Sequence, residues 1–256
     1  MILHDIATGE GAPPLVLLHG LFGSARNFAT VQRAFARHRR TIALDLRNHG
    51  ASPHDADMRY ATMAADVLAT LERLGALPAV LLGHSMGGKA AMQAALLQPD
   101  AVARLIVADI APVAYPPHLR ATAAAMAALT LAANLTRAEA DTALAAAVPD
   151  AATRAFLLQN LRLGATPGWR IGLAEIIAGF ADIEAWDVPG DARYHGPTLI
   201  IAGATSHYIR PEHRPIVRAL FPRARFVTLK NAGHWLHADN PSGFVDVVEG
   251  FLTAPG

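Results

Sequence analysis

The chain has 256 residues, enough for one large alpha/beta domain or two small ones. Hydrophobic residues make up 52% of the sequence and charged residues 17%, which favours a large buried core over disorder. The formal net charge is +1 and there is no cysteine, so neither nucleic acid nor an anionic membrane is an expected partner, and disulfides, cysteine-ligated metals and a cysteine nucleophile are excluded.

The N-terminal residues and the apolar runs bear on where the protein works. Residues 1–5 lack a basic segment followed by a long apolar run, the pattern of a signal peptide. No uninterrupted apolar run reaches about 18 residues, the length that predicts a membrane-spanning helix. The expectation is therefore a cytoplasmic protein without a membrane span.

The first half of the chain alternates short apolar runs with helical patterns. Continuous apolar runs such as 15–18 are typical of strands buried on both faces of a parallel sheet. Strands are predicted at 2–7, 15–18, 41–44, 79–82 and 104–108, and helices at 26–37, 60–74 and 89–97. In the loop after 41–44, Asp45 and Arg47 are expected to hold the backbone by hydrogen bonds, with Gly50 at a tight turn.

The segment 83–88 joins one of these strands to a helix and carries a Gly-x-Ser-x-Gly pattern centred on Ser85. A strand that turns sharply into a helix at such a serine is the nucleophile elbow of alpha/beta hydrolases. Gly83 and Gly87 are expected because a Cβ at either position would clash in so tight a turn. Ser85 is therefore predicted to be the nucleophile, held in a strained conformation at the helix N-terminus.

A glycine-rich loop at 19–24 follows the buried strand 15–18, at the edge where alpha/beta sheets bind ligands. In this fold, that loop supplies one backbone N–H of the oxyanion hole, and the residue after the nucleophile supplies the other. The two donors are predicted to be Leu21 and Met86, with Phe22 the nearest competitor of Leu21. A plain strand-to-helix turn is the alternative interpretation of the loop.

The character of the chain changes after residue 115. Two prolines are followed by an alanine-rich, helical stretch in which no strand is predicted, and a capping box at 136–139 opens one of its helices. Strands at 197–201 and 225–229 and helices at 212–220 and 244–252 then resume the alternation. We expect core segments at 1–115 and 192–256, with 116–191 inserted as a helical cap.

A serine nucleophile needs a base, and the base needs an orienting acid, in the chain order Ser, acid, His. His234 lies in a loop after the last predicted strand and is expected to be the base. The loop at 202–209, where the acid is usual, has no carboxylate. Asp109, at the end of the preceding core strand, is therefore predicted to be the acid, with Ser206 as a supporting hydroxyl.

With these residues in view, the chain resembles the YbfF-type esterases of the alpha/beta-hydrolase superfamily. The resemblance rests on segments 19–24, 45–50, 83–89, 109–113 and 233–238. It implies an alpha/beta-hydrolase fold, with a mostly parallel sheet flanked by helices. It also implies hydrolysis of short- to medium-chain acyl esters or thioesters, with Ser85, Asp109 and His234 as triad and Ser206 in support.

Other readings stay open at this stage. Carbon–carbon bond hydrolases and lyase-type relatives share the same three residues, and a non-catalytic binding protein could use the same pocket. Aromatic residues that could line an apolar substrate pocket are Phe22, Trp169, Trp186 and Trp235, although core packing is the alternative for each tryptophan. The expected partner is a small-molecule acyl ester or thioester; no cofactor or metal is expected, and the sequence does not indicate an oligomeric state.

Overall fold

The computed structural model describes residues 1–254, so the last two positions of the expected core segment 192–256 lie outside the described residues. Its main feature is a seven-stranded sheet in the order β1-β3-β2-β4-β5-β8-β9. The strands are β1 (Asp5–Thr8), β2 (Leu15–Leu18), β3 (Thr41–Leu44), β4 (Ala79–His84), β5 (Val102–Ala108), β8 (Thr198–Gly203) and β9 (Ala224–Leu229). β1 is antiparallel to β3, and all other neighbouring pairs are parallel.

The central strands bury both faces, as their continuous apolar sequences predict. In β2, Leu15 and Leu17 belong to one hydrophobic cluster, whereas Val16 and Leu18 belong to the other. Successive side chains of a strand point to opposite faces, so a run of four leucines and valines supplies two cores at once.

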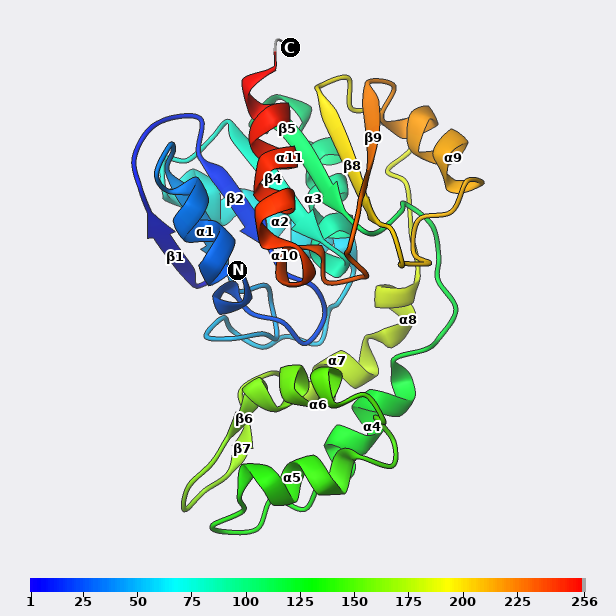
Figure 1. Ribbon diagram of the computed structural model, residues 1–256. Coiled ribbons are helices and arrows are strands. Elements are labelled where there is room, and N and C mark those ends of the chain that lie inside the picture. The colour runs from blue at the N-terminus through cyan, green and yellow to red at the C-terminus, as the bar shows by residue number, and fades with distance from the viewer. Residues whose placement is uncertain (255–256) are drawn as a thin grey trace.

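Helices cover both faces of the sheet (Figure 1). The short α1 (Ala29–Phe35) and the C-terminal α11 (Pro241–Thr253) pack on one face, with α10 (Leu236–Asp239) leading into α11. Helices α2 (Tyr60–Arg73), α3 (Met86–Leu97) and α9 (His213–Leu220) contribute to the cluster on the other face. Because neighbouring strands from β3 to β9 are parallel, their carboxyl ends all lie at one edge of the sheet. The loops that follow β2, β4, β5, β8 and β9 meet at this edge.

The alanine-rich segment falls between β5 and β8, which are neighbours in the sheet (Figure 1). It forms α4 (Arg120–Ala128), α5 (Arg137–Leu144), α6 (Ala151–Leu157), α7 (Leu173–Ala178) and α8 (Phe180–Glu184). Thr136 caps α5, and its hydroxyl accepts a hydrogen bond from the Glu139 N–H, as the capping box predicts. The prediction that no strand interrupts this segment is wrong, because β6 (Leu161–Arg162) and β7 (Gly168–Trp169) form a small antiparallel hairpin. Strands of only two residues each are too short to produce an alternating sequence pattern.

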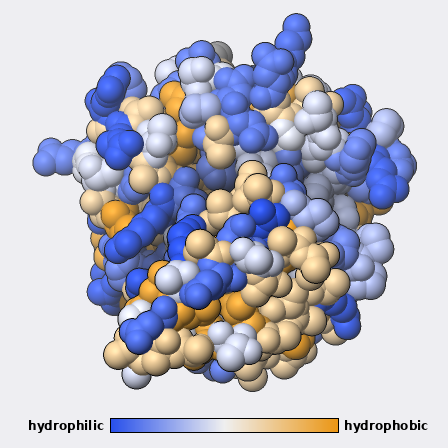
Figure 2. All heavy atoms as spheres, turned by 60° about the horizontal axis from the view of Figure 1, so that its bottom comes forward, coloured by the Kyte–Doolittle hydropathy of each residue, from blue (hydrophilic) through white to orange (hydrophobic). Residues whose placement is uncertain are grey.

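The outside of this inserted segment is unusually apolar. Figure 2 shows hydrophobic side chains gathered over the lower part of the molecular face in view. On α4, alanines occupy outward positions as well as inward ones, and Leu163, Ile177 and Val188 are exposed elsewhere in the segment. Within residues 1–254, every helix is too short or too polar to cross a lipid bilayer.

Candidate active site

The turn between β4 and α3 holds Ser85 in a backbone conformation that few non-glycine residues adopt, with φ 51° and ψ −120°. Such strained residues concentrate at functional sites. The two glycines allow the turn, since a Cβ on Gly83 would lie 2.1 Å from the Gly87 carbonyl oxygen. A Cβ on Gly87 would lie 2.3 Å from the Leu18 carbonyl oxygen in β2. The steric expectation for both positions is confirmed.

Asp109 follows β5 directly and is fully buried. Its backbone is also in the left-handed region, with φ 54°. One carboxylate oxygen, Oδ1, accepts a hydrogen bond of 3.0 Å from the Gly203 N–H at the end of β8. The other, Oδ2, accepts from the Ser206 hydroxyl and lies 2.8 Å from Nδ1 of His234. The carboxylate therefore connects the ends of β5 and β8 with the loop after β9.

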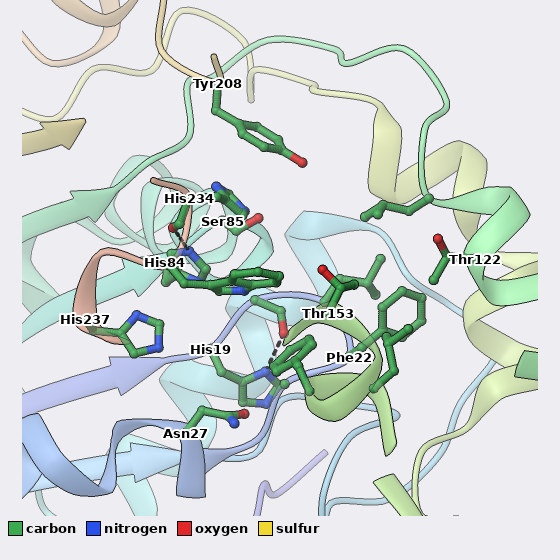
Figure 3. Close-up of a pocket in the computed structure, with 17 residues that line it drawn as sticks. His19, Phe22, Asn27, His84, Ser85, Thr122, Thr153, Tyr208, His234 and His237 are labelled. Atoms are coloured by element: carbon green, nitrogen blue, oxygen red, sulfur yellow. Dashed lines mark hydrogen bonds between the residues drawn. The ribbon is translucent and has the colours of Figure 1, made fainter. Parts of the chain in front are cut away.

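His234 lies in that loop, and its ring is held on both an edge and a face. Nδ1 is bonded to Asp109, and the phenol ring of Tyr208 stacks on the imidazole with centroids 4.0 Å apart and planes 18° apart. Figure 3 shows His234 beside Ser85, with Tyr208 above them in the view. Burial raises the pKa of Tyr208 to about 12, so its phenol stays neutral near pH 7.

The two predicted oxyanion donors lie close to Ser85. Leu21 and Met86 both line a cavity that Ser85 also lines, and in the described part of the chain neither N–H has a protein acceptor. Phe22 differs, because its N–H donates to Nε2 of His49 at 3.1 Å. This bond leaves Leu21, rather than Phe22, with a free N–H in the loop.

Two neutral histidines and one aspartate hold the loops after β2 and β3 in place near Ser85. Burial lowers the pKa of His49 to about 3 and also lowers that of His19. His19 accepts from the Leu46 N–H and donates to the Gly20 carbonyl, which ties the loops after β2 and β3 together. Asp45 accepts from backbone N–H groups of both loops, and a Cβ on Gly50 would lie 2.1 Å from its carboxyl carbon.

Arg47 has the structural role expected from the sequence. Its guanidinium is buried and forms an ion pair of 2.6 Å with the equally buried Asp66 of α2. It also donates to the Asp57 carbonyl, so it anchors the loop after β3 to the helix that follows.

A cavity of about 250 Å³ opens beside Ser85 and His234 (Figure 3). Its walls come from two sides of the molecule. The core contributes Phe22, Trp235 and several histidines, and the inserted segment contributes residues from the start of α4 and from α6. Those residues are Leu119, Thr122, Thr153, Phe156 and Leu157. The Phe156 and Trp235 rings pack with centroids 5.6 Å apart, so the inserted segment closes over the core here.

A second, smaller cavity of about 50 Å³ also borders Ser85. Leu21, Ser85, Leu119 and Tyr208 line both cavities, so Ser85 stands where they meet. The small cavity also contains Lys89, whose side chain is buried. The Lys89 ammonium donates to the Ala185 carbonyl at 2.8 Å and lies 5.1 Å from the ring centroids of Tyr60 and Tyr115.

Lys89 makes the stability of the protein depend on pH. Burial lowers its pKa from an ordinary 10.5 to about 7, so between these values the unfolded chain binds one more proton than the folded protein. The free energy of unfolding therefore rises with pH through this window, by at most about 1.4 kcal/mol per pH unit. Urea unfolding measures this against Lys89→Met, which lacks the titrating group. Between about pH 7.5 and 9.5, the free energy of unfolding of the wild type should rise by about 2 kcal/mol relative to that of the variant. A stability difference independent of pH would contradict this assignment.

The structure brings only some of the four predicted pocket aromatics to a cavity beside Ser85. Phe22 and Trp235 line the larger cavity. Trp169 and Trp186 line neither cavity: Trp169 donates to the Met126 carbonyl inside the inserted segment, and Trp186 packs against Tyr60 with centroids 6.2 Å apart. Both tryptophans therefore have the packing role that was the alternative for them. Tyr208 was missed, although it stands two residues after Ser206.

Within residues 1–254, no three or more histidine, aspartate or glutamate side chains are arranged so that they could hold a metal ion.

Comparison with known proteins agrees with this geometry. The family model for the alpha/beta hydrolase fold matches residues 13–241. The chain belongs to the alpha/beta hydrolase fold family.

The similar proteins include esterases and lipases. The chain is 42% identical over 259 residues to the mouse sn-1-specific diacylglycerol lipase ABHD11, covering 97% of this chain and 84% of that protein. It is 34% identical to esterase YbfF of Escherichia coli, with 93% of this chain and 92% of that protein covered. The solved structure of a marine microorganism esterase superposes with a TM-score of 0.94 at 34% identity, covering 98% of this chain and 99% of that one. The chain is thus a carboxylic ester hydrolase, similar both to YbfF and to ABHD11.

Proposed function

We propose that the protein is a serine esterase that cleaves short- to medium-chain acyl esters or thioesters through an acyl-enzyme on Ser85. The base is His234 and its orienting acid is Asp109. The proposal rests above all on the 2.8 Å hydrogen bond between His234 Nδ1 and Asp109 Oδ2, beside the cavity that Ser85 lines. A nucleophile, a base and an orienting group in one place form the arrangement that serine hydrolases use.

In the first half-reaction, Nε2 of His234 takes the Ser85 hydroxyl proton while Oγ attacks the ester carbonyl carbon. The Leu21 and Met86 N–H groups stabilise the oxyanion, an effect worth about 3–4 kcal/mol for one such donor. The tetrahedral intermediate collapses, the leaving alcohol or thiol takes the proton from His234, and the acyl group stays on Ser85. Water then cleaves the acyl-enzyme by the same route and regenerates Ser85.

We also propose that residues 116–191 are a cap on a core formed by 1–115 and 192–256. The cap contributes Leu119, Thr122, Thr153, Phe156 and Leu157 to the larger cavity, which supports a role in substrate selection. At about 250 Å³ this cavity lies below the roughly 300–1,000 Å³ typical of drug-sized ligand sites. A cavity of this size supports a short or medium acyl chain rather than a complete lipid.

Covalent labelling and a graded substrate series test this function. A fluorophosphonate probe should label the wild type and Ser242→Ala, in which an exposed serine is removed, but not Ser85→Ala. With p-nitrophenyl esters of increasing chain length, kcat/KM should peak at short to medium chains, and matched thioesters test the leaving group. Labelling that persists in Ser85→Ala would place the nucleophile elsewhere.

Ser206→Ala tests the supporting hydroxyl. Ser206 donates to Asp109 Oδ2, the oxygen that also binds His234. A hydrogen bond to a charged group contributes about 1.5–3 kcal/mol, so kcat should fall by about tenfold or more while KM changes little. Unchanged kcat in a folded Ser206→Ala protein would remove Ser206 from the proposal.

A further inference from the structure

His84 is a buried imidazole that precedes Ser85 in the chain and packs against His234. It is the last residue of β4, directly precedes Ser85, and is 3% exposed. Its Nε2 lies 2.7 Å from the backbone carbonyl oxygen of His234. A carbonyl oxygen only accepts, so Nε2 carries the proton and donates it to this bond.

The same ring also touches the loop that carries Leu21. A Cβ on Gly20 would lie 3.0 Å from His84 Nδ1, so the imidazole packs directly against this part of the backbone. The His84 and His234 rings pack with centroids 4.7 Å apart and planes inclined by 45°. One side chain on a rigid strand thus contacts the loop after β2 and the loop after β9.

The loop that carries His234 needs such a contact, because Asp109 binds only the side chain. That bond fixes one edge of the ring, and Tyr208 covers one face. The position of Nε2 toward Ser85 also depends on the backbone from which the ring projects. The backbone is tied at Gly233, whose N–H donates to Asp239 at 2.8 Å, and at the His234 carbonyl by His84.

We propose that His84 is a positioning residue for the base, and that its Nε2–H holds the His234 carbonyl so that the His234 ring keeps its orientation toward Ser85. The inference rests on the proposed function, in which His234 is the base. A displacement of about 1 Å in a catalytic group can cost about a hundredfold in rate, so a single backbone anchor has a measurable effect.

The charge state of His84 suits this role. Burial, and then the neighbouring His234 and His237, hold the pKa of His84 well below its ordinary value. His84 therefore stays neutral while His234 becomes an imidazolium in the reaction. A charged imidazole at 4.7 Å would oppose that step.

A matched pair of variants separates the hydrogen bond from the packing. His84→Gln keeps an amide donor near the position of Nε2, and His84→Met has a similar length without a donor. His84→Met should lower kcat about tenfold with KM within about twofold, and His84→Gln should restore kcat to within about threefold of the wild type. The downfield proton resonance of the His234–Asp109 bond should broaden or vanish in His84→Met and persist in His84→Gln. The exposed His38→Gln serves as control.

The outcomes separate this inference from the function on which it rests. Fluorophosphonate titration counts competent sites, so rates are compared per active site; if His84→Met does not fold, His84→Phe takes its place. Equal losses in the donor and non-donor variants, or wild-type kcat in both, would overturn the role of His84. Full activity in His234→Ala would instead overturn the proposed function.

Discussion

Asp109→Asn is expected to lower kcat by about three to four orders of magnitude, as loss of the orienting carboxylate does in serine hydrolases generally. In the proposed mechanism, the carboxylate accepts a hydrogen bond from Nδ1–H of His234, which leaves Nε2 without a proton and able to take that of Ser85. An asparagine amide can donate to Nδ1 instead, and the proton then moves to Nε2, where it blocks the base. The measurement is kcat for a p-nitrophenyl ester, with labelling by a fluorophosphonate as a second readout.

Glu212→Gln is the matched control, because Glu212 follows the loop in which alpha/beta hydrolases usually carry the acid. Its side chain is 63% exposed and lies 3.7 Å from Arg210. We expect this variant to keep wild-type kcat. If Glu212→Gln were the damaging change and Asp109→Asn the harmless one, the acid would have to be reassigned to the segment after β8.

Gly83→Ala is expected to have the largest effect on folding. The added Cβ would lie 2.1 Å from the Gly87 carbonyl oxygen and 2.5 Å from its carbon, and neither backbone atom can rotate away. The first turn of α3 must then move away from β4, which shifts Ser85. We expect a loss of about 3–5 kcal/mol in the free energy of unfolding, or failure to fold, and at least a hundredfold loss of kcat in any folded fraction.

Gly250→Ala provides the comparison within the same chain. Gly250 lies in α11, and a Cβ there meets no other atom within 4 Å. Alanine is favoured over glycine in a helix by about 1 kcal/mol, so this variant should be as stable as the wild type or more so. Chemical unfolding followed by circular dichroism measures both variants. A Gly83→Ala protein with the stability of Gly250→Ala would show that the elbow tolerates a side chain.

The sheet could be predicted because its strands are buried on both faces. The apolar runs at 15–18 and 41–44 coincide with β2 and β3, and the order of strands and helices outside 116–191 is as expected. Boundaries were less accurate: the helix expected at 26–37 is a 3₁₀ turn at Ala25–Phe28 followed by α1. Asp109 could be proposed from sequence because the loop after the next strand offers no carboxylate.

The rest of the site depends on contacts that no local pattern reports. Tyr208 meets His234 only because the loops after β8 and β9 come together in space. Lys89 reads as an ordinary helical lysine, and its burial between Tyr60, Tyr115 and Ala185 depends on how the inserted segment joins the sheet. The roles of Trp169 and Trp186 were similarly undecided, since an aromatic side chain in a core and one in a pocket look alike in sequence.

The contact between Ser206 and Asp109 bears on how such enzymes diverge. Ser206 donates to the same Asp109 oxygen that binds His234 Nδ1, and the two residues follow adjacent parallel strands. A lineage can therefore exchange serine and aspartate between these two positions while the nucleophile and the base stay where they are. The position of the acid in the sequence then differs between lineages, whereas its position in space, beside the histidine ring, stays the same.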